Sequence, residues 1–467
     1  MLKSGLQRGV VVSKRLQSGF SKKARDVLSS TDATLSELTN GVRVVSVNNN
    51  KPVTTLGVWV DSGSRYETED NNGVAQVLEN LLYKGTAKRS TKQLQADLAK
   101  YGARLNSFTS RDHAAYFVQV ENKNIEPVTE ILADVLRNSK FDQADVEAAK
   151  QVVLKQLDEV EQNHEEVAYD YLHMTAFQGT GLGLSPYGRV EAVQNLSRQD
   201  VIDFADDHYK ADRVVVAAVG GVAHGQLDAF AKANFGDLSN EYKRAVPAPM
   251  GTRFTGSEFQ YRDDDYPNLY AAIAVEGVAN GHPDALALQL AAQFTGQWDV
   301  THGTGINAPV KAVQRTSQLN GLISFEPFCV HYADTGLFGL RWVSTGLDQE
   351  DSHDIVSAAQ RQWKHQATGV TEQEVDRAKN QLRSVLLSRL SNSTALAHHL
   401  ATRVLHTGDV ENLSELEEKL RRLNAGNVRE AVSRHVYDRD LAMSGVGKTE
   451  ALCNYIQIRH TQSWWRL

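Results

Sequence analysis

The sequence has few cysteines and no long run of apolar residues. Only two of its 467 residues are cysteine, Cys329 and Cys453, so the chain cannot build a disulfide framework. The two are 124 positions apart and form no C-x-x-C metal or redox motif. The longest apolar stretch, 214–222, includes two glycines and has the length of a strand. It is far shorter than the roughly 18 apolar residues of a membrane-spanning helix, and we expect none.

An excess of positive charge is also missing. The chain has 57 acidic residues against 50 lysines and arginines, a net charge of −7. A dedicated nucleic-acid binder needs a basic face, so we expect no nucleic acid among the partners. With roughly 150 residues per domain as a guide, the length predicts two to three domains, each large enough to bury its own core.

The charge is uneven at the start of the chain. Residues 1–25 carry seven basic residues and no acidic one, and apolar residues recur every four positions at Leu2, Leu6 and Val10. This pattern is typical of a mitochondrial transit peptide, and it lacks the continuous apolar core of a secretory signal. We interpret 1–25 as a transit peptide; the alternative is a disordered basic tail on a cytosolic protein.

Periodicity places several elements in the first half of the remaining chain. Segments 41–48 and 54–60 read as strands around an Asn-Asn-Asn-Lys-Pro turn, so they predict a hairpin. The remaining predictions are helices at 74–83, 91–100 and 126–138, a long helix from about 142 to beyond 161, and strands at 114–120 and 209–222. Only 240–255, with Pro247, Pro249 and Gly251, has the composition of a linker.

Beyond this linker, segments of the first half recur in the same order. Segment 57–63 resembles 272–278, 112–118 resembles 334–340, and 141–150 resembles 370–379. The offset grows from 215 to 222 to 229, as loop insertions would make it. We therefore expect an α+β protein with an internal duplication, comprising the lobes 26–245 and 246–467.

One helical motif comes close to a metal site. Gln76 and Asn80 are four residues apart and share a helix face, with Glu79 beside them. Two histidines in place of Gln76 and Asn80 would make the H-x-x-E-H motif of an inverted zincin, in which the glutamate takes a proton from metal-bound water. This chain has Gln-x-x-Glu-Asn instead.

The segment around this motif, 71–86, resembles a known family, as do 57–66, 208–222, 332–337 and the ending Trp-Trp-Arg-Leu. That family comprises the β-type subunits of mitochondrial processing peptidase and the related core proteins of ubiquinol–cytochrome c oxidoreductase (complex III), all pitrilysin-like. The resemblance extends from 40–43 to the end of the chain. It implies that each lobe is a mixed β-sheet packed against helices.

The resemblance also identifies the positions of the zinc ligands. In active β-type subunits these are the two histidines of H-x-x-E-H and a glutamate some 76 residues downstream, which correspond here to Gln76, Asn80 and Gln156. All three are neutral amides, weak ligands without negative charge, so we expect no metal, no cofactor and no catalytic residue. Glu79 is then a relic of proton transfer, and we expect the three amides to hydrogen-bond one another.

Two other groups could bind metal, and for both a simpler reading is favoured. The acidic residues of the long helix fit a solvated face better than substitute ligands; they are Asp158, Glu159, Glu161, Glu165 and Glu166. His398, His399 and His406 could form a cluster, but no acidic residue stands at ligand spacing, so ordinary surface or core histidines are expected. The two cysteines are expected to be buried thiols.

The resemblance leads to three functional hypotheses. The favoured one is a non-catalytic scaffold of complex III, peripheral to the mitochondrial inner membrane on its matrix side. Its partners would be a core protein II-type subunit and the complex III subunits that carry haem and iron–sulfur centres. The alternatives are a β-type processing peptidase subunit, which needs zinc, and a non-catalytic partner that binds presequence peptides in its cleft.

Overall fold

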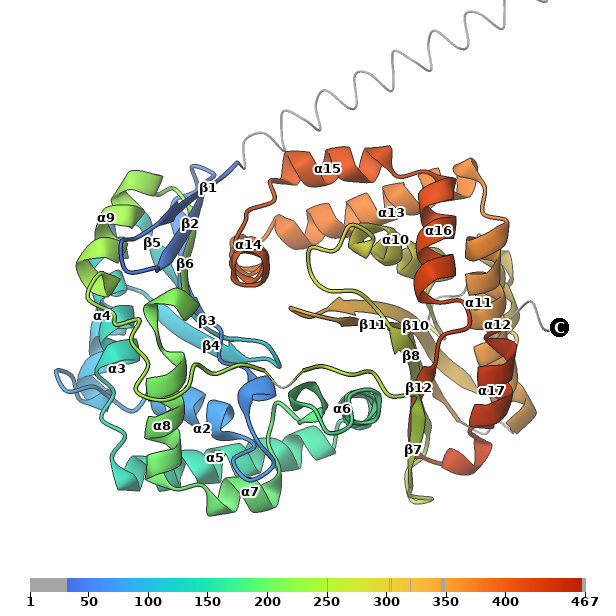
Figure 1. The fold of residues 1–467 in the computed structure, drawn as a ribbon, viewed down its shortest axis with the longest axis horizontal. Coiled ribbons are helices and arrows are strands. Elements are labelled where there is room, and N and C mark those ends of the chain that lie inside the picture. Colours follow the sequence, from blue (N-terminus) through green and yellow to red (C-terminus); the bar gives the residue numbers. More distant parts are fainter. Residues whose placement is uncertain are drawn as a thin grey trace, which may run out of the picture.

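The computed structural model describes residues 32–249, 251–301, 303, 305–319, 321–345 and 349–463. The expected transit peptide at 1–25 and the ending at 464–467 lie outside these residues. The described chain forms two lobes, each built on one six-stranded sheet (Figure 1). In the described residues no helix has the length and apolar character needed to cross a membrane.

The N-terminal sheet has the strand order β1-β2-β6-β3-β5-β4. Its central strand, β6, consists of valine, alanine and one glycine and is buried at every position, as a strand covered on both faces should be. It runs parallel to β2 and antiparallel to β3. The strands are β1 (Ala33–Glu37), β2 (Arg43–Asn48), β3 (Val53–Val60), β4 (Arg104–Thr109), β5 (Ala114–Glu121) and β6 (Val214–Gly220).

The predicted hairpin between 41–48 and 54–60 is wrong, because β6 lies between β2 and β3. The connection 49–52 passes over the end of β6, where Asn49 N–H donates to the Gly220 carbonyl at 2.9 Å. Two strand spacings are about 10 Å, a distance that four residues can span. A turn of this composition therefore fits both a hairpin and this crossing.

The C-terminal sheet repeats this topology, with the order β7-β12-β8-β11-β10-β9. As in the first sheet, one strand of the parallel pair is fully buried; here it is β12, which lies between β7 and β8. The lobes differ in their extra edge strand, β1 in one sheet and β9 in the other. The strands are β7 (Ser257–Arg262), β8 (Leu269–Glu276), β9 (Trp298–Asp299), β10 (Leu322–His331), β11 (Gly336–Ser344) and β12 (Leu441–Gly447).

The three sequence pairs fall on equivalent elements, so the predicted two-lobe α+β duplication is confirmed. Segments 57–63 and 272–278 cover β3 and β8, and 112–118 and 334–340 lead into β5 and β11. Segments 141–150 and 370–379 begin α5 and α13, which are both 19 residues long. Between 236 and 256, around the predicted linker, the described residues contain no helix or strand.

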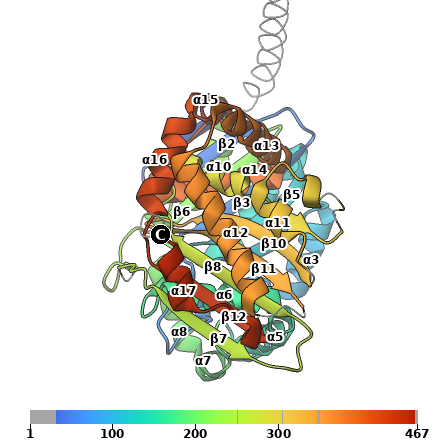
Figure 2. The ribbon, with the colours of Figure 1, turned by 90° about the vertical axis from the view of Figure 1, so that its right-hand side faces the viewer.

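In each lobe, helices cover the outer face of the sheet, and further helices pack on these; Figure 2 shows α12 across the second sheet. The N-terminal lobe contributes α2 (Val74–Leu81), α3 (Thr91–Lys100), α4 (Ile125–Arg137), α5 (Gln143–Glu161), α6 (His164–Ala176), α7 (Val190–Asn195), α8 (Arg198–His208) and α9 (His224–Phe235). The C-terminal lobe contributes α10 (Ala285–Thr295), α11 (Lys311–Thr316), α12 (Gln349–Thr368), α13 (Glu372–Leu390), α14 (Ser393–Thr407), α15 (Leu413–Arg422), α16 (Ala425–His435) and α17 (Tyr455–Thr461).

Two predicted elements are longer than the observed ones. The strand expected at 209–222 begins only at Val214, because Ala211–Arg213 form a single 3-10 turn. The long helix expected to pass 161 ends at Glu161, and a separate helix, α6, starts at His164. Asn163 caps α6 by accepting the Glu166 N–H, and this local bond favours a new helix start over continuation of α5.

One helix of each lobe packs on the inner face of the other lobe's sheet. Helix α6 packs on β12, β8 and β7, and α14 packs on β6, β3 and β2 (Figure 1). Leu172 and Ala176 of α6 join Ala272, Ala274 and Ala442 of the second sheet in one buried cluster. The small side chains of that sheet allow the helix to approach closely.

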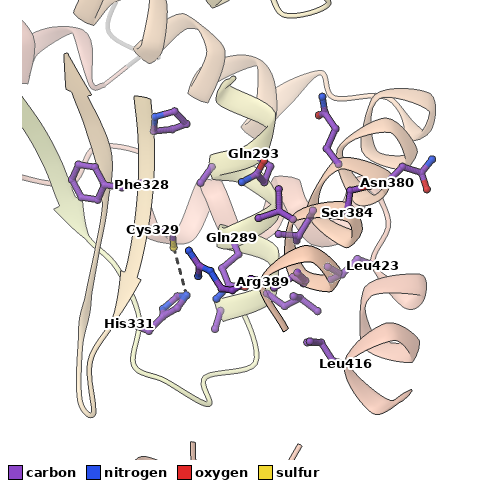
Figure 3. A pocket seen from close by; sticks show the side chains of 18 of the residues that line it. Gln289, Gln293, Phe328, Cys329, His331, Asn380, Ser384, Arg389, Leu416 and Leu423 are labelled. Atoms are coloured by element: carbon purple, nitrogen blue, oxygen red, sulfur yellow. Dashed lines mark hydrogen bonds between the residues drawn. The ribbon is translucent and has the colours of Figure 1, made fainter. Parts of the chain in front are cut away.

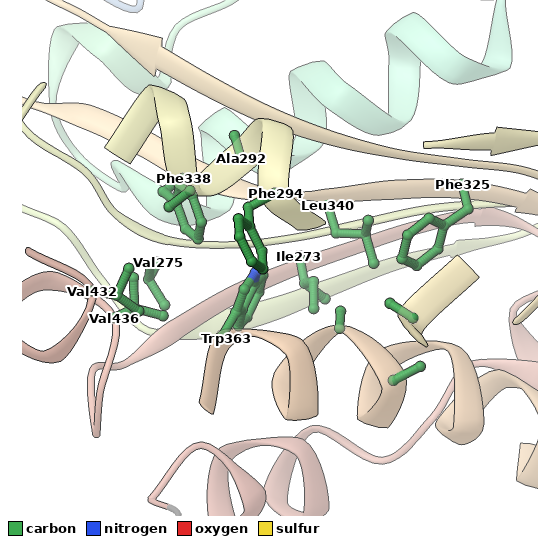
Figure 4. Packing of buried hydrophobic residues seen from close by; sticks show 14 of the residues in the cluster. Ile273, Val275, Ala292, Phe294, Phe325, Phe338, Leu340, Trp363, Val432 and Val436 are labelled. Carbon is green, nitrogen blue, oxygen red and sulfur yellow. The ribbon is translucent and has the colours of Figure 1, made fainter. Parts of the chain in front are cut away.

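The largest buried cluster lies between the C-terminal sheet and its outer helices (Figure 4). Trp363 of α12 packs on Phe338 of β11, with ring centroids 5.6 Å apart, and both side chains are fully buried. Phe294 of α10 lies in the same cluster. A core of this size gives the C-terminal lobe its own hydrophobic stabilisation.

Candidate functional site

Helix α2 carries the Gln-x-x-Glu-Asn segment of residues 76–80, and a buried carboxylate holds the first turn of the helix in place. Gly73 precedes the helix with a φ of 99°, which a side-chain-bearing residue adopts only with strain. The Glu67 carboxylate accepts the N–H groups of Gly73 at 2.8 Å and Ala75 at 2.9 Å, and Asn72 Nδ2 at 2.8 Å. This arrangement satisfies N–H groups that the helix itself leaves without partners.

Helix α2 packs against α5, so Gln76, Asn80 and Gln156 meet. Gln76 Nε2 lies 3.4 Å and Asn80 Nδ2 lies 3.5 Å from Gln156 Oε1. Asn80 Nδ2 also donates to the Gln76 backbone carbonyl at 3.0 Å. The three half-buried amides therefore lie together, with the Gln156 oxygen accepting from both other side chains.

The Glu79 carboxylate contacts the edge strand β4. Its two carboxylate oxygens accept hydroxyl groups from that strand, Ser107 Oγ at 2.7 Å and Thr109 Oγ1 at 2.6 Å. Tyr83 OH donates in turn to Ser107 Oγ at 2.6 Å. Burial raises the pKa of Glu79, and the two hydroxyl donors act to lower it. Through these two hydrogen bonds Glu79 connects α2 to β4.

The donor set of this site does not match zinc. Zinc sites use imidazole, thiolate or carboxylate ligands, whereas the three side chains here offer only amide oxygens without charge. The Gln156 oxygen already accepts two N–H groups. Glu79 in turn accepts hydroxyl groups from Ser107 and Thr109, so amide and carboxylate hydrogen bonds hold the arrangement together.

The acidic residues considered as substitute ligands lie on two helices. Asp158, Glu159 and Glu161 are exposed on α5, whereas Glu165 and Glu166 belong to α6. Glu165 lines a small pocket together with Arg341 of the C-terminal lobe. Among the hydrogen bonds of the described residues, none joins these carboxylates to the three amides of α2 and α5.

Two of the three histidines of α14, His398 and His406, contact the N-terminal lobe. His398 Nδ1 accepts the Trp59 indole N–H at 3.1 Å, and burial lowers the pKa of His398 to about 4. His406 Nδ1 lies 3.0 Å from Asn280 Nδ2, and its Nε2 lies 3.4 Å from an Asp112 oxygen. Burial lowers the pKa of His399 as well. All three histidines are half-buried.

A large pocket of about 2830 Å³ lies in the C-terminal lobe, lined by residues between 280 and 427 (Figure 3). Cys329 Sγ, on its wall, lies 3.5 Å from His331 Nε2, while His331 Nδ1 lies 2.8 Å from the Val278 carbonyl. Burial raises the pKa of the Cys329 thiol to about 12, so this partly buried cysteine is a neutral thiol. Cys453 is buried, and its pKa is also raised to about 12.

Known proteins resemble this chain in sequence and in fold. Residues 43–188 match the family model described as Insulinase (Peptidase family M16), and 195–382 match Peptidase M16 inactive domain. Cytochrome b-c1 complex subunit 1 of Caenorhabditis elegans is 48% identical over 444 residues, which cover 95% of this chain and 94% of that protein.

A second relative and a solved structure extend the comparison. The β subunit of mitochondrial-processing peptidase of Mus musculus is 39% identical over 440 residues, covering 94% of this chain and 89% of that protein. A chain of complex III2 from Candida albicans, solved with Inz-5 bound, superposes with a TM-score of 0.81 at 26% identity and covers 92% of this chain and 99% of that chain. The chain therefore belongs to peptidase family M16, in the group that contains cytochrome b-c1 complex subunit 1 and the β subunit of mitochondrial-processing peptidase.

Proposed function

We propose that this protein is a core subunit of mitochondrial complex III, where it supports the assembly and stability of the enzyme that passes electrons from ubiquinol to cytochrome c. The observation that carries the proposal is 48% identity to cytochrome b-c1 complex subunit 1 along 95% of the chain. The likeness to a chain of complex III2 supports the same assignment. Its partners are a core protein II-type subunit and the subunits that carry haem and iron–sulfur centres.

The subunit is non-catalytic in this proposal. Amides at Gln76, Asn80 and Gln156 provide neither the charge nor the ligand strength that zinc requires. Glu79, the one acidic residue of the motif, is held by Ser107 and Thr109 in a structural contact. The scaffold sits on the matrix side of the inner membrane as a peripheral subunit, delivered by residues 1–25 as a cleaved transit peptide.

Co-purification tests the assignment to complex III. Inner membranes solubilised in mild detergent should yield this chain at a constant ratio to b- and c-type haem through successive columns, with haem measured from absorbance spectra. Elution of the chain solely as a haem-free dimer from the soluble matrix would overturn the proposal.

The second candidate is a β-type processing peptidase subunit, which 39% identity over 94% of the chain and the presence of Glu79 both favour. A cleavage assay separates the two. The natural chain, mixed with an active-type α subunit, should leave a presequence peptide intact. Zinc-dependent cleavage would establish the peptidase function and exclude the scaffold as the sole function.

Restoring the ligands tests whether α2 and α5 are still placed as in a peptidase. The variant Gln76→His/Asn80→His/Gln156→Glu should take up one zinc ion more per chain than the natural protein, as measured by metal analysis after gel filtration. The matched variant Gln76→His/Asn80→His lacks the carboxylate and should bind the added ion more weakly. If the triple variant folds and gains no zinc, the ligand positions have been assigned wrongly.

A further inference from the structure

Two histidines and an aspartate meet where one helix of the C-terminal lobe begins and another ends. His282 lies in the turn before α10, Asp284 is the residue that precedes the first residue of α10, and His435 is the last residue of α16. One ligand atom of each lies within 4.8 Å of the others, and no second such group of His, Cys, Asp and Glu occurs in the described part of the chain.

The carboxylate of Asp284 faces the histidines. An aspartate at this position commonly caps its helix, but here the side chain makes no capping hydrogen bond. Its Oδ2 lies 2.9 Å from His435 Nε2, and the rings of His282 and His435 are 5.5 Å apart, edge to face. His282 is exposed, and the side chains of Asp284 and His435 are 21% and 18% exposed, so an ion and a water molecule can reach the group.

We propose that His282, Asp284 and His435 form a binding site for a zinc-like divalent cation. Two imidazoles and one carboxylate are ligands that zinc prefers, and three protein ligands with one open position for water are a common zinc arrangement. This site is unrelated to the amides of α2 and α5 and stands apart from the proposed function.

The bonds of the metal-free group must rearrange when the ion binds. His282 Nδ1 accepts the Asp284 backbone N–H at 3.1 Å, so zinc coordinating through Nδ1 would release that N–H to water. His435 would carry its proton on Nδ1 and coordinate through Nε2. Each exchange replaces one solvent-accessible hydrogen bond with a coordinate bond.

Arg434 competes with the cation. Its Nη1 donates to Asp284 Oδ2 at 2.7 Å, and its side chain is 56% exposed, so it can swing into solvent. An ion pair of Arg434, Asp284 and His435 that serves only to join α10 to α16 is the simpler reading of these contacts. The two readings predict different results when Arg434 is replaced. If the group is a metal site, metal binding should strengthen, because a positive charge leaves and a carboxylate oxygen is freed.

Zinc titration of the purified full chain tests the site. We expect one zinc ion bound per chain, measured by competition with a chromogenic chelator, and a higher melting temperature on adding zinc, since the ion binds the folded state. His282→Ala, Asp284→Asn and His435→Ala should each weaken binding about tenfold or more, and Arg434→Gln should strengthen it several-fold. His460→Ala, at an exposed histidine of α17, is the matched control and should change nothing.

Cobalt provides a readout that is specific to the ligand set. Co²⁺ bound by the natural chain should show the intense visible absorption of a four-coordinate site, and His435→Ala should abolish it. Zinc affinity that none of the three ligand substitutions reduces, or that Arg434→Gln weakens, would overturn the proposal and leave the group as an ion pair.

Discussion

Two buried carboxylates, one before α2 and one on it, hold the helix that carries the Gln-x-x-Glu-Asn segment in place. Glu67 accepts three N–H groups around the start of the helix, and Glu79 accepts two hydroxyl groups from β4. Both residues therefore have structural partners that do not depend on a metal ion.

Removal of the Glu79 side chain should destabilise the protein, whereas its amide analogue should be tolerated. In Glu79→Ala the hydroxyls of Ser107 and Thr109 lose their acceptor, at a cost of about 1–3 kcal/mol in the free energy of unfolding. Glu79→Gln can accept from one hydroxyl and donate to the other, so its unfolding free energy should change by less than about 1 kcal/mol. Urea denaturation measures both; equal stability of Glu79→Ala and the natural chain would contradict the structural role.

Glu67 should make stability depend on pH near neutrality. Burial raises its pKa from 4.5 to about 7, so the folded state binds more protons than the unfolded state between these values. The stability that this group contributes is therefore fully present below pH 4.5 and is lost as the pH rises to 7, by roughly 3 kcal/mol. Between pH 5 and 8, the melting temperature of the natural chain should fall relative to that of Glu67→Gln, whose amide does not titrate.

A matched variant isolates this effect. Glu69→Gln changes an exposed carboxyl group two residues away and should keep the pH dependence of the natural chain. A Glu67→Gln variant that follows the same pH curve as Glu69→Gln would show that another group titrates.

At the scale of elements, the exchange of α6 and α14 joins the lobes more closely than a linker would. Helix α14 fills the inner face of the N-terminal sheet, where its Leu396, Ala397 and Leu400 lie in one cluster with Trp59 of β3 and Ala217 of β6. Neither sheet is covered on both faces by its own lobe alone. We therefore expect the two lobes to unfold together, because separation would expose both inner faces to water.

Leu400→Ala should destabilise both lobes at once. The side chain is 2% exposed in the cluster between α14 and the N-terminal sheet, so its truncation should cost about 2–5 kcal/mol. Unfolding followed by calorimetry should remain one transition at a lower temperature. Leu387→Ala, at a leucine of α13 that is 39% exposed, is the control and should have a much smaller effect. Two separate transitions in the Leu400→Ala variant would show that the lobes are independent.

At the scale of the whole molecule, one arginine connects matching positions of the two repeats. Arg65 Nη1 lies 2.7 Å from Asp112, in the turn before β5, and Nη2 lies 2.9 Å from Asp334, in the turn before β11. Asp112 also accepts the Ala333 N–H at 3.1 Å. Burial raises the pKa of Asp112 even though His406 and Arg65 act to lower it, so this carboxylate depends on its partners.

The two aspartates should respond differently to neutralisation. The Arg65 and Asp112 side chains are 2% and 6% exposed, so Asp112→Asn leaves a buried arginine short of its charge partner and should cost about 3–5 kcal/mol in unfolding free energy. Asp334 is 42% exposed, and Asp334→Asn should cost no more than about 1 kcal/mol. Urea denaturation of the two variants measures the difference; equal losses would mean that burial does not control the strength of these pairs.

Local patterns in the sequence determined the type and position of most elements in the first half of the chain. Apolar residues at spacings of three and four give α2, α3 and α5 their buried faces, and the same spacing places Gln76, Glu79 and Asn80 on one helix. The ordered matches along the chain were sufficient to predict the duplication, because repeated segments keep their order along the chain. The position of Gln156 beside the motif came from the family resemblance alone.

Only the tertiary structure decided which elements became neighbours. A period of two shows that β2 and β3 are strands but does not show that β6, more than 150 residues further along the chain, separates them. In the same way, the amphipathic pattern of α14 predicts that one face of the helix is buried. The pattern does not predict that the sheet of the other lobe covers that face. His435 joins His282 and Asp284 across about 150 residues for the same reason: local patterns fix which face of an element is buried, and packing of the whole chain fixes what covers it.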